Sequence, residues 1–387
     1  MINTHRILRI CLIAFASFTL PPLARAADAP VITVSKSDTI ALAFQPISGP
    51  DGPVISKVLQ ADLAATGYFT LSSPGSASLI AGGSSSGSQL DGKVNDHSGR
   101  AAVAGTYNGD ARAQAHAFAN DIIQTLTGNR GIAGSRIAFA STRSGRKEIY
   151  VADYDGSAVQ QLTHDNSISV GPSLSPGGRL LAYTGYKSGY ADIYLVNLST
   201  GTRDRIVKYP GTNSGAAFSP SGDRIACTLS KDGNPELYIC GLNGSAHRLT
   251  HTPGVESSPT WSPSGDEIIY SYDDHHGPRL FRISASGGSG QLVSTGFGYC
   301  TEPDWSPDGA KIAFNVRESG SFSVAVMDLH GGGSRVIASG ERPVWGPDSR
   351  HLVYSDGGTL YLIDVQTGRK KAIVSGLGRA TEPTWSR

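Results

Sequence analysis

Cysteine, net charge and long apolar runs are all scarce in this chain of 387 residues. It carries 33 basic and 32 acidic side chains, which gives a formal net charge of +1. A chain this close to neutral is a poor match for nucleic acid or for an anionic membrane, so we expect neither as its main partner. The apolar run at residues 10–20 is too short to span a bilayer comfortably, and no later run is long enough either.

The residue patterns of catalysis are also missing. No paired carboxylates stand out, and no glycine-rich phosphate loop follows a predicted strand. Residues 83–87 match G-x-S-x-G, but they lie in a Ser/Gly tract instead of between a strand and a helix. His275 and His276 follow two aspartates at a predicted hairpin tip, where a solvated tip explains them more simply than a metal site. We therefore expect no enzymatic activity, no cofactor and no metal.

The first residues predict export. Arg6 and Arg9 precede the short apolar run, and Ala24-Arg25-Ala26 is a typical cleavage site. We interpret residues 1–26 as a secretory signal peptide, with Cys11 too early in the apolar run for a lipoprotein. Its removal takes away three arginines and no acidic residue, which changes the formal charge from +1 to −2. In a bacterium the mature protein is then expected in the periplasm, without a membrane span.

Three cysteines remain after this cleavage, namely Cys227, Cys240 and Cys300. An odd number in an oxidising compartment leaves at least one thiol unpaired. Cys227 and Cys240 lie on the two arms of one predicted hairpin, and a tip centred between Gly233 and Asn234 places them directly opposite each other. They are either a cross-strand disulfide or two small buried apolar residues.

One short motif recurs six times: a bulky apolar residue, then Ser or Gly, then Pro. The copies begin at Leu174, Phe218, Trp261, Trp305, Trp345 and Trp385, and Arg387 stands where the sixth Pro is expected. These residues lie 44, 43, 44, 40 and 40 positions apart. A fixed period of this length, with aromatic residues and glycines recurring in each repeat, is typical of a β-propeller.

Each motif is followed by a turn, an apolar run, a polar tip and a second apolar run, which together predict four short strands per blade. The two ends of the repeat array are complementary. Residues 135–151 form a blade without a leading motif, and residues 383–386 form a leading motif without a blade. Joining them gives a six-bladed ring over residues 135–387, closed by the C-terminal strand. A linear solenoid would leave both halves unpaired.

A smaller domain is predicted over residues 39–130, after an extended leader at 27–38. Residues 39–44 and 68–71 are predicted strands, and the apolar spacing from Val54 to Leu63 predicts a helix ended by Gly67. Residues 89–94 and 101–107 form a predicted hairpin, and a second helix from Ala115 to Leu126 ends at Gly128. The Ser/Gly-rich stretch at 72–88 is predicted to be a flexible loop. The fold class is thus mainly β, with a small α/β domain before the propeller.

The repeats, of which Ser306-Pro307-Asp308-Gly309 is the cleanest, resemble those of the TolB family. The junction around Leu126-Thr127-Gly128 and Arg136-Ile137-Ala138 is also similar to that family. The resemblance covers nearly all of the mature chain. The N-terminal domain is shorter than is usual in the family, and the leader, which contacts TolA in the family, is short as well.

This resemblance implies a non-enzymatic, monomeric periplasmic adaptor of the Tol-Pal system, which supports outer-membrane integrity and cell division. It implies that the peptidoglycan-associated lipoprotein Pal binds the open face of the propeller, and that TolA contacts the leader. Two other interpretations are a sugar- or peptide-binding envelope propeller and a propeller accessory to a hydrolase. The second needs an α/β-hydrolase domain, for which the chain has no room.

We predict that the binding face is formed by the loops that lead into the inner strands. The candidate residues are Ser169, Asn213, Ser214, Glu256, Ser257, Ser258, Tyr299, Thr301, Glu302, Arg342, Arg379, Thr381 and Glu382. Thr301-Glu302-Pro303 and Thr381-Glu382-Pro383 match the Thr-Glu-Pro of the Pal-binding mouth in the family, whereas Ser257-Ser258-Pro259 departs from it. The alternative is that Glu302 and Glu382 accept hydrogen bonds from the backbone of a neighbouring blade.

Overall fold

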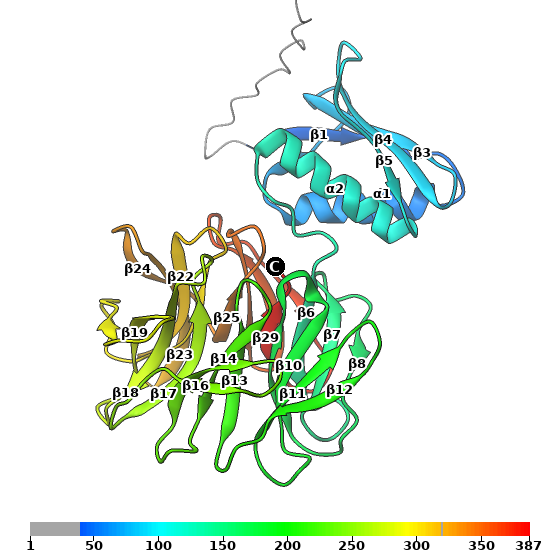
Figure 1. Cartoon of the computed structure of the whole chain (residues 1–387). Helices are drawn as coiled ribbons and strands as arrows, with labels where there is room; N and C mark the ends of the chain where they lie inside the picture. Colours follow the sequence, from blue (N-terminus) through cyan, green and yellow to red (C-terminus); the bar gives the residue numbers. More distant parts are fainter. Residues whose placement is uncertain (1–38, 319) are drawn as a thin grey trace, which may run out of the picture. The chain divides into compact units, whose positions relative to one another are not determined.

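The structure, a computed structural model, describes residues 39–318 and 320–387. The predicted signal peptide and leader lie outside this range. The described chain begins with a small α/β domain and continues into a propeller (Figure 1). Within the described ranges, no helix has both the length and the apolar character needed to cross a membrane.

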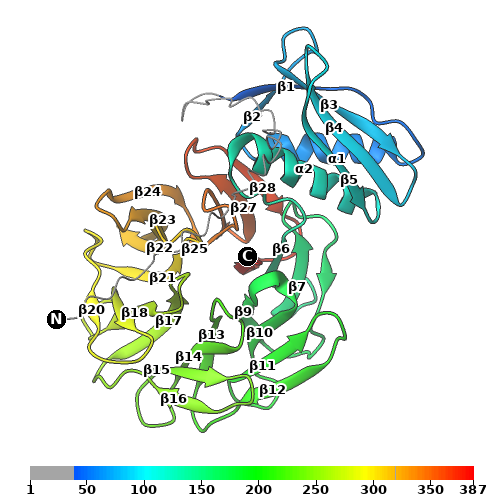
Figure 2. The same ribbon diagram turned by 45° about the horizontal axis from the view of Figure 1, so that its top comes forward.

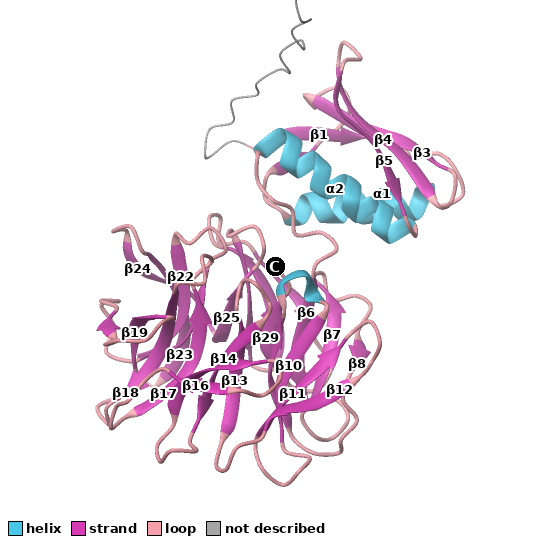
Figure 3. Cartoon of the chain, viewed as in Figure 1, coloured by secondary structure: helices cyan, strands magenta, loops and turns pink. Residues whose placement is uncertain are grey.

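The α/β domain has one mixed sheet and two helices (Figure 3). The sheet order is β2-β1-β3-β4-β5, with β1, β2 and β3 parallel and the rest antiparallel. Apolar residues of α1 and α2, such as Leu59 and Phe118, are buried in one core with the sheet. The elements are β1 (Ile40–Phe44), α1 (Gly52–Ala65), β2 (Phe69–Leu71), β3 (Leu79–Ser85), β4 (Gln89–Asp96), β5 (Ala101–Asn108) and α2 (Ala111–Thr127).

The prediction of a flexible loop at residues 72–88 is wrong for its second half. Strand β3 runs from Leu79 to Ser85 and pairs with both β1 and β4. Its glycines have a packing role, since a Cβ on Gly83 would lie 2.4 Å from the Asp91 carbonyl oxygen of β4, and a Cβ on Gly82 would lie 3.2 Å from the Gln45 side chain. Small residues let neighbouring segments of the chain approach β3 closely, so a composition typical of loops occurs here in a strand.

The ends of α2 follow helix-capping rules. The Asp110 side chain accepts a hydrogen bond of 2.9 Å from the Ala113 N–H, and Gly128 adopts the left-handed conformation with φ of 72°. The predicted C-terminal glycine of this helix is therefore confirmed. Helix α1 differs, because Thr66 caps it one residue before the predicted Gly67.

Six four-stranded antiparallel sheets form the propeller, and the prediction of closure by the C-terminal strand is confirmed. Strand β29 (Ala380–Trp385) is the inner strand of blade 1, where it pairs with β6 (Arg136–Ser141). Figure 2 looks into the ring, with the C-terminus near its centre. Blade 1 is completed by β7 (Glu148–Asp153) and β8 (Gln160–Gln161).

The other five blades follow in chain order, each starting with its inner strand. Blade 2 consists of β9 (Ser169–Leu174), β10 (Leu180–Gly185), β11 (Asp192–Asn197) and β12 (Arg203–Val207). Blade 3 consists of β13 (Asn213–Phe218), β14 (Arg224–Leu229), β15 (Glu236–Gly241) and β16 (Ala246–Arg248). Blade 4 consists of β17 (Val255–Trp261), β18 (Glu267–Asp273), β19 (Arg279–Ser284) and β20 (Gln291–Leu292). Blade 5 consists of β21 (Cys300–Trp305), β22 (Lys311–Glu318), β23 (Ser321–Asp328) and β24 (Gly333–Ser339). Blade 6 consists of β25 (Glu341–Trp345), β26 (His351–Asp356), β27 (Thr359–Asp364) and β28 (Lys370–Val374).

The recurring aromatic residues end the inner strands and are buried at the junctions between blades. Trp385 explains why the fifth motif contains Gly346 in place of Ser. A Cβ on Gly346 would lie 2.8 Å from the Trp385 ring, so the closing blade requires glycine there. The indole N–H of Trp385 also donates to the Ser135 hydroxyl at 2.8 Å. The closing strand is thus held by packing and by a specific hydrogen bond.

Cys227 and Cys240 do not lie directly opposite each other as predicted. Cys227 pairs with Tyr238, and Cys240 pairs with Ile225, because the hairpin tip is centred between Asp232 and Gly233, one residue earlier than expected. Both side chains are fully buried, and their sulfurs lie 3.1 Å apart, within hydrogen-bond distance and without a disulfide bond.

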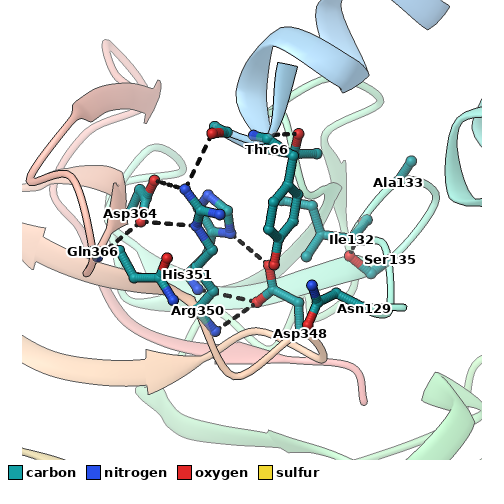
Figure 4. Close-up of polar contacts among 12 residues, drawn as sticks. Thr66, Asn129, Ile132, Ala133, Ser135, Asp348, Arg350, His351, Asp364 and Gln366 are labelled. Atoms are coloured by element: carbon teal, nitrogen blue, oxygen red, sulfur yellow. Dashed lines mark hydrogen bonds and ion pairs between the residues drawn. The ribbon is translucent and has the colours of Figure 1, made fainter. Parts of the chain in front are cut away.

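Several buried contacts join the α/β domain to turns of blades 1 and 6. Arg350 forms an ion pair of 2.7 Å with Asp364 and donates a 3.3 Å hydrogen bond to the Gly67 carbonyl (Figure 4). Asp62 of α1 contacts both His116 of α2 and the Tyr154 hydroxyl of blade 1, each at 2.7 Å. These turns lie at the ends of the strands opposite to the loops that lead into the inner strands, so the predicted binding face makes none of these contacts.

Candidate functional site

Every inner strand of the propeller is interrupted by a bulge at the same position. One residue in each has a positive φ between 52° and 65°, and the pairing register shifts there. These six residues, which we call the mouth ring, are Gly171, Gly215, Ser258, Glu302, Arg342 and Glu382. Such backbone is costly for a residue with a side chain, and in folded proteins it concentrates at functional sites.

The mouth ring surrounds one end of the axial channel. Its six residues line a cavity of about 170 Å³. Five of the six are directly followed by a proline, and these five prolines also line the cavity. The bulges therefore bring together three charged side chains, Glu302, Arg342 and Glu382, from blades 5, 6 and 1. These were among the residues predicted from the sequence, and the structure places them around one opening.

Glu382 links three segments of the ring. One carboxylate oxygen accepts a 2.6 Å hydrogen bond from the Gly171 backbone N–H of blade 2, and the other forms a 2.9 Å ion pair with Lys147. Burial raises the pKa of Glu382, but the Arg342 charge and the contacts with Lys147 and Gly171 outweigh it and lower the net pKa. Glu382 thus accepts a hydrogen bond from the backbone of a neighbouring blade, which is the alternative to partner binding that the sequence allowed.

Glu302 is held by side chains instead. It forms a 2.6 Å ion pair with Arg342 and accepts a 2.6 Å hydrogen bond from the Asn315 amide. Burial raises the pKa of Glu302 above its usual value, and the Arg342 charge opposes this increase. The Asn315 side-chain oxygen also accepts a 2.9 Å hydrogen bond from the Arg342 backbone N–H. Asn315 of β22 therefore contacts both members of the Glu302–Arg342 ion pair.

Three of the predicted residues are completely buried beneath the mouth. Ser169, Asn213 and Glu256 each lie two residues before a member of the mouth ring. The Asn213 amide donates to the Ala191 and Tyr209 carbonyls at 3.0 and 2.8 Å, so it fastens the loop between blades 2 and 3. Their side chains support the mouth from below and do not reach its surface.

The remaining predicted residues lie nearer to the surface. Ser214, Ser257, Thr301 and Thr381 each immediately precede a ring member and are partly buried, as is Ser258 of the ring. Tyr299 is half-buried, with its ring 6.1 Å from that of Phe322 and with Arg317 stacked over it. Arg379 is exposed in the loop that leads into β29.

Glu256 faces a second buried carboxylate. One of its oxygens accepts a 2.6 Å hydrogen bond from Thr252, whereas the other has no hydrogen-bond partner in the described structure. Nearby Glu236 is also fully buried and is paired with Arg248 at 2.6 Å. Burial and the Glu236 charge raise the pKa of Glu256 to about 7, although the Thr252 hydrogen bond opposes them.

This arrangement predicts that the free energy of unfolding decreases as the pH rises from 4.5 to 8. The folded state keeps a proton on Glu256 that the unfolded chain, with a carboxyl pKa of 4.5, releases. Stability from this group is complete below pH 4.5 and is lost as the pH rises through 7, by on the order of 3 kcal/mol. Glu256→Gln keeps a neutral side chain and should remove this component. Urea unfolding at several pH values tests it, with the partly exposed Glu267→Gln as control, and parallel pH profiles for wild type and Glu256→Gln would contradict the assignment.

Sequence reasoning missed a charged pair inside the channel. Asp304 lines both the mouth cavity and a second axial cavity of about 300 Å³, and it forms an ion pair with Arg387. The Trp345 backbone N–H donates to the same carboxylate at 2.7 Å. Burial raises the pKa of Asp304, and the Arg387 charge and the Trp345 hydrogen bond oppose this. The replacement of the expected Pro by Arg at position 387 was the only signal in the sequence.

No group of three or more potential metal-ligating side chains occurs within residues 39–318 and 320–387. His275 and His276 lie at the tip between β18 and β19, where Asp273 and Asp274 accept hydrogen bonds from their backbone N–H groups. This turn is a local hydrogen-bonded structure on an exposed tip.

The sequence matches that of known propellers over most of its length. A family model described as the TolB beta propeller domain matches residues 123–387. The Tol-Pal system protein TolB of Geobacter sulfurreducens is 51% identical over 86 residues, which cover 21% of this chain and 20% of that protein. The corresponding protein of Geobacter metallireducens is 35% identical over 166 residues, covering 34% and 39%. These matches span well under half of the length of either relative.

A solved structure extends the likeness to the whole described fold. The crystal structure of TolB from Acinetobacter baumannii is similar with a TM-score of 0.80, over 90% of this chain and 97% of that chain. At 24% identity, this likeness supports the fold alone. Since the family model covers more than half of its residues, the chain belongs to the TolB β-propeller family.

Proposed function

We propose that this protein is a non-enzymatic periplasmic adaptor of the Tol-Pal system that binds Pal at the propeller mouth. Family membership supports the system, because the curated relatives carry the name Tol-Pal system protein. The single observation that carries the proposed site is the mouth ring, which fixes three charged side chains on strained backbone around one opening. Pre-organised charges bind a partner without a large ordering cost.

The proposed contacts use the exposed parts of the mouth. Arg342 is the most accessible of the three charged ring residues, with 42% of its side chain exposed, against 19% for Glu302 and 11% for Glu382. The other proposed contact residues, which surround these three, are Ser214, Ser257, Ser258, Tyr299, Thr301, Arg379 and Thr381. Ser169, Asn213 and Glu256 hold the loops in place. We also propose that TolA contacts the N-terminal leader.

The test is a double charge reversal, Glu302→Lys with Glu382→Lys. We expect binding of purified soluble Pal to weaken by about 2–5 kcal/mol, because two charge-assisted contacts are replaced by repulsion with Arg342 and Lys147. Isothermal calorimetry measures the affinity, and a thermal melt measures the fold. Glu382→Gln is the conservative partner variant, since its amide oxygen still accepts from the Gly171 N–H.

A matched control is Glu267→Lys, which reverses a charge at the opposite end of the strands, where Glu267 pairs with Arg282 at 3.4 Å. We expect its Pal affinity to equal that of wild type. Unchanged affinity in the double reversal would place the site elsewhere. Equal losses of stability and affinity would favour a purely structural role for the two glutamates.

A further inference from the structure

Some cations on the mouth face have an acidic partner, whereas others, including Lys208 before β13 and Arg317 at the end of β22 as well as three arginines near Glu382, have none within residues 39–318 and 320–387. Lys147, Lys187 and Arg342 each have an acidic partner, at 2.9, 3.1 and 2.6 Å. Arg143, Arg146 and Arg379 are exposed, and none of them has an acidic partner within residues 39–318 and 320–387. All three belong to loops next to Glu382, two in the β6–β7 hairpin and one in the loop that leads into β29.

The two loops that carry these arginines are tied together. The Arg379 backbone N–H donates to the Thr142 hydroxyl at 2.9 Å, and the Thr142 N–H donates to the Arg379 carbonyl at 3.4 Å. A Cβ on Gly378 would lie 2.6 Å from the Arg143 nitrogen, so the backbones are in close contact. Three positive charges without an acidic partner in the described residues are therefore concentrated on adjoining, hydrogen-bonded loops at one side of the mouth.

An exposed apolar group adjoins these charges in blade 2. Ile168, Tyr186 and Tyr190 are 45%, 39% and 74% exposed. The Tyr186 N–H donates to the Ile168 carbonyl at 2.9 Å, and the Ser169 N–H donates to the Lys147 carbonyl at 2.8 Å. Backbone hydrogen bonds thus connect the apolar group to the β6–β7 hairpin and, through Lys147, to Glu382.

We infer that Arg143, Arg146, Arg379, Ile168, Tyr186 and Tyr190 form one docking surface, the basic–aromatic rim, for a carboxylate-rich patch of the protein partner. The inference rests on the proposed function, because it takes Pal as that partner. Exposed Arg and Tyr side chains on ordered loops are the residue types that dominate protein interfaces. Arginines without internal partners attract acidic groups and accelerate association, while the tyrosines slow dissociation.

The experiment measures binding of soluble Pal to the full mature chain by surface plasmon resonance at two salt concentrations. Arg143→Glu with Arg146→Glu should raise Kd by about tenfold or more, mainly through a slower association rate, and should reduce its salt dependence. Tyr190→Ala should raise Kd by about tenfold, mainly through faster dissociation. Thermal melts of both variants should match wild type, since these side chains are exposed.

Matched controls come from other parts of the propeller. Arg179→Glu changes an exposed arginine in the β9–β10 turn, at the opposite strand ends, and Leu292→Ala changes an exposed apolar residue on the outer strand β20. If the wild type binds Pal and both rim variants bind it with unchanged rates, the inference is overturned and the proposed function still stands. No binding of Pal to wild type would overturn both. Loss of binding to peptidoglycan fragments, with Pal binding intact, would assign the rim to a glycan and also overturn the inference.

Discussion

Deletion of residues 381–387 should lower the stability of the propeller by about 5 kcal/mol or more. The deletion removes most of β29, including buried Trp385, and leaves β6 without its inner neighbour. Loss of a buried Trp alone costs roughly 3–5 kcal/mol, and each lost backbone hydrogen bond adds about 1 kcal/mol. An unpaired edge on β6 also invites association with other chains.

Differential scanning calorimetry and size-exclusion chromatography measure both effects. We expect the melting temperature to fall by about 10 °C or more, together with a new oligomeric fraction. Trp385→Ala separates the contributions, because it keeps the strand but loses the packing and the hydrogen bond to Ser135. A truncated protein that melts within a degree or two of wild type would contradict the importance of ring closure.

The closure itself was predictable from the sequence, because half-repeats at the two ends of the array complement each other. The blades were predictable for a related reason. Each is a local unit, with turns after Pro and Gly and apolar runs of strand length, so short-range patterns determine it. Glycine had the opposite effect in β3, where Gly83 and its neighbours suggested a loop. Their reason is the close approach of neighbouring segments, such as the Asp91 carbonyl oxygen of β4 at 2.4 Å from a Cβ on Gly83, and no local pattern reveals such a contact.

The mouth was predictable only in part. The loops that lead into the inner strands could be located by counting strands, and Glu302 and Glu382 stood out by their Thr-Glu-Pro context. The bulges were not foreseen, although a proline after five of the six positive-φ residues was the available signal. Asn213 and Glu256 appeared suitable for a surface because they are polar. Burial depends on how neighbouring blades pack, which no local pattern reveals.

The charge pair in the channel leads to the second large effect. Arg387→Ala leaves the Asp304 carboxylate in the channel wall without its counter-charge. The pair is partly exposed, with 17% of the Asp304 and 28% of the Arg387 side chain accessible. Loss of Arg387 should therefore cost on the order of 2 kcal/mol, less than the roughly 3–5 kcal/mol for breaking a fully buried pair, because water still partly solvates the remaining carboxylate. The substitution also removes the 3.0 Å hydrogen bond from Arg387 to the Trp305 carbonyl. We therefore expect a clear loss of stability at neutral pH from a single side chain.

The pH dependence identifies the cause. Burial already raises the pKa of Asp304 above 3.8, and loss of Arg387 removes a charge that lowers it. A carboxyl group with a raised folded-state pKa stabilises the folded state at low pH and loses that contribution as the pH rises through this pKa. The deficit of Arg387→Ala relative to wild type should therefore shrink on acidification, and urea unfolding at pH 5 and pH 8 measures it.

A second substitution tests whether the deficit comes from the unpaired carboxylate. Asp304→Asn in the Arg387→Ala background removes the charge but keeps an oxygen that accepts from the Trp345 N–H, so it should recover part of the lost stability at pH 8. Arg179→Ala, on an exposed turn, should leave stability unchanged. If Arg387→Ala and the double variant unfold at the same urea concentration at both pH values, then Arg387 acts only by packing. Recovery of stability in the double variant would instead explain why the sixth repeat has Arg where the other five have Pro. The ring then closes with a cation that neutralises the carboxylate in its channel.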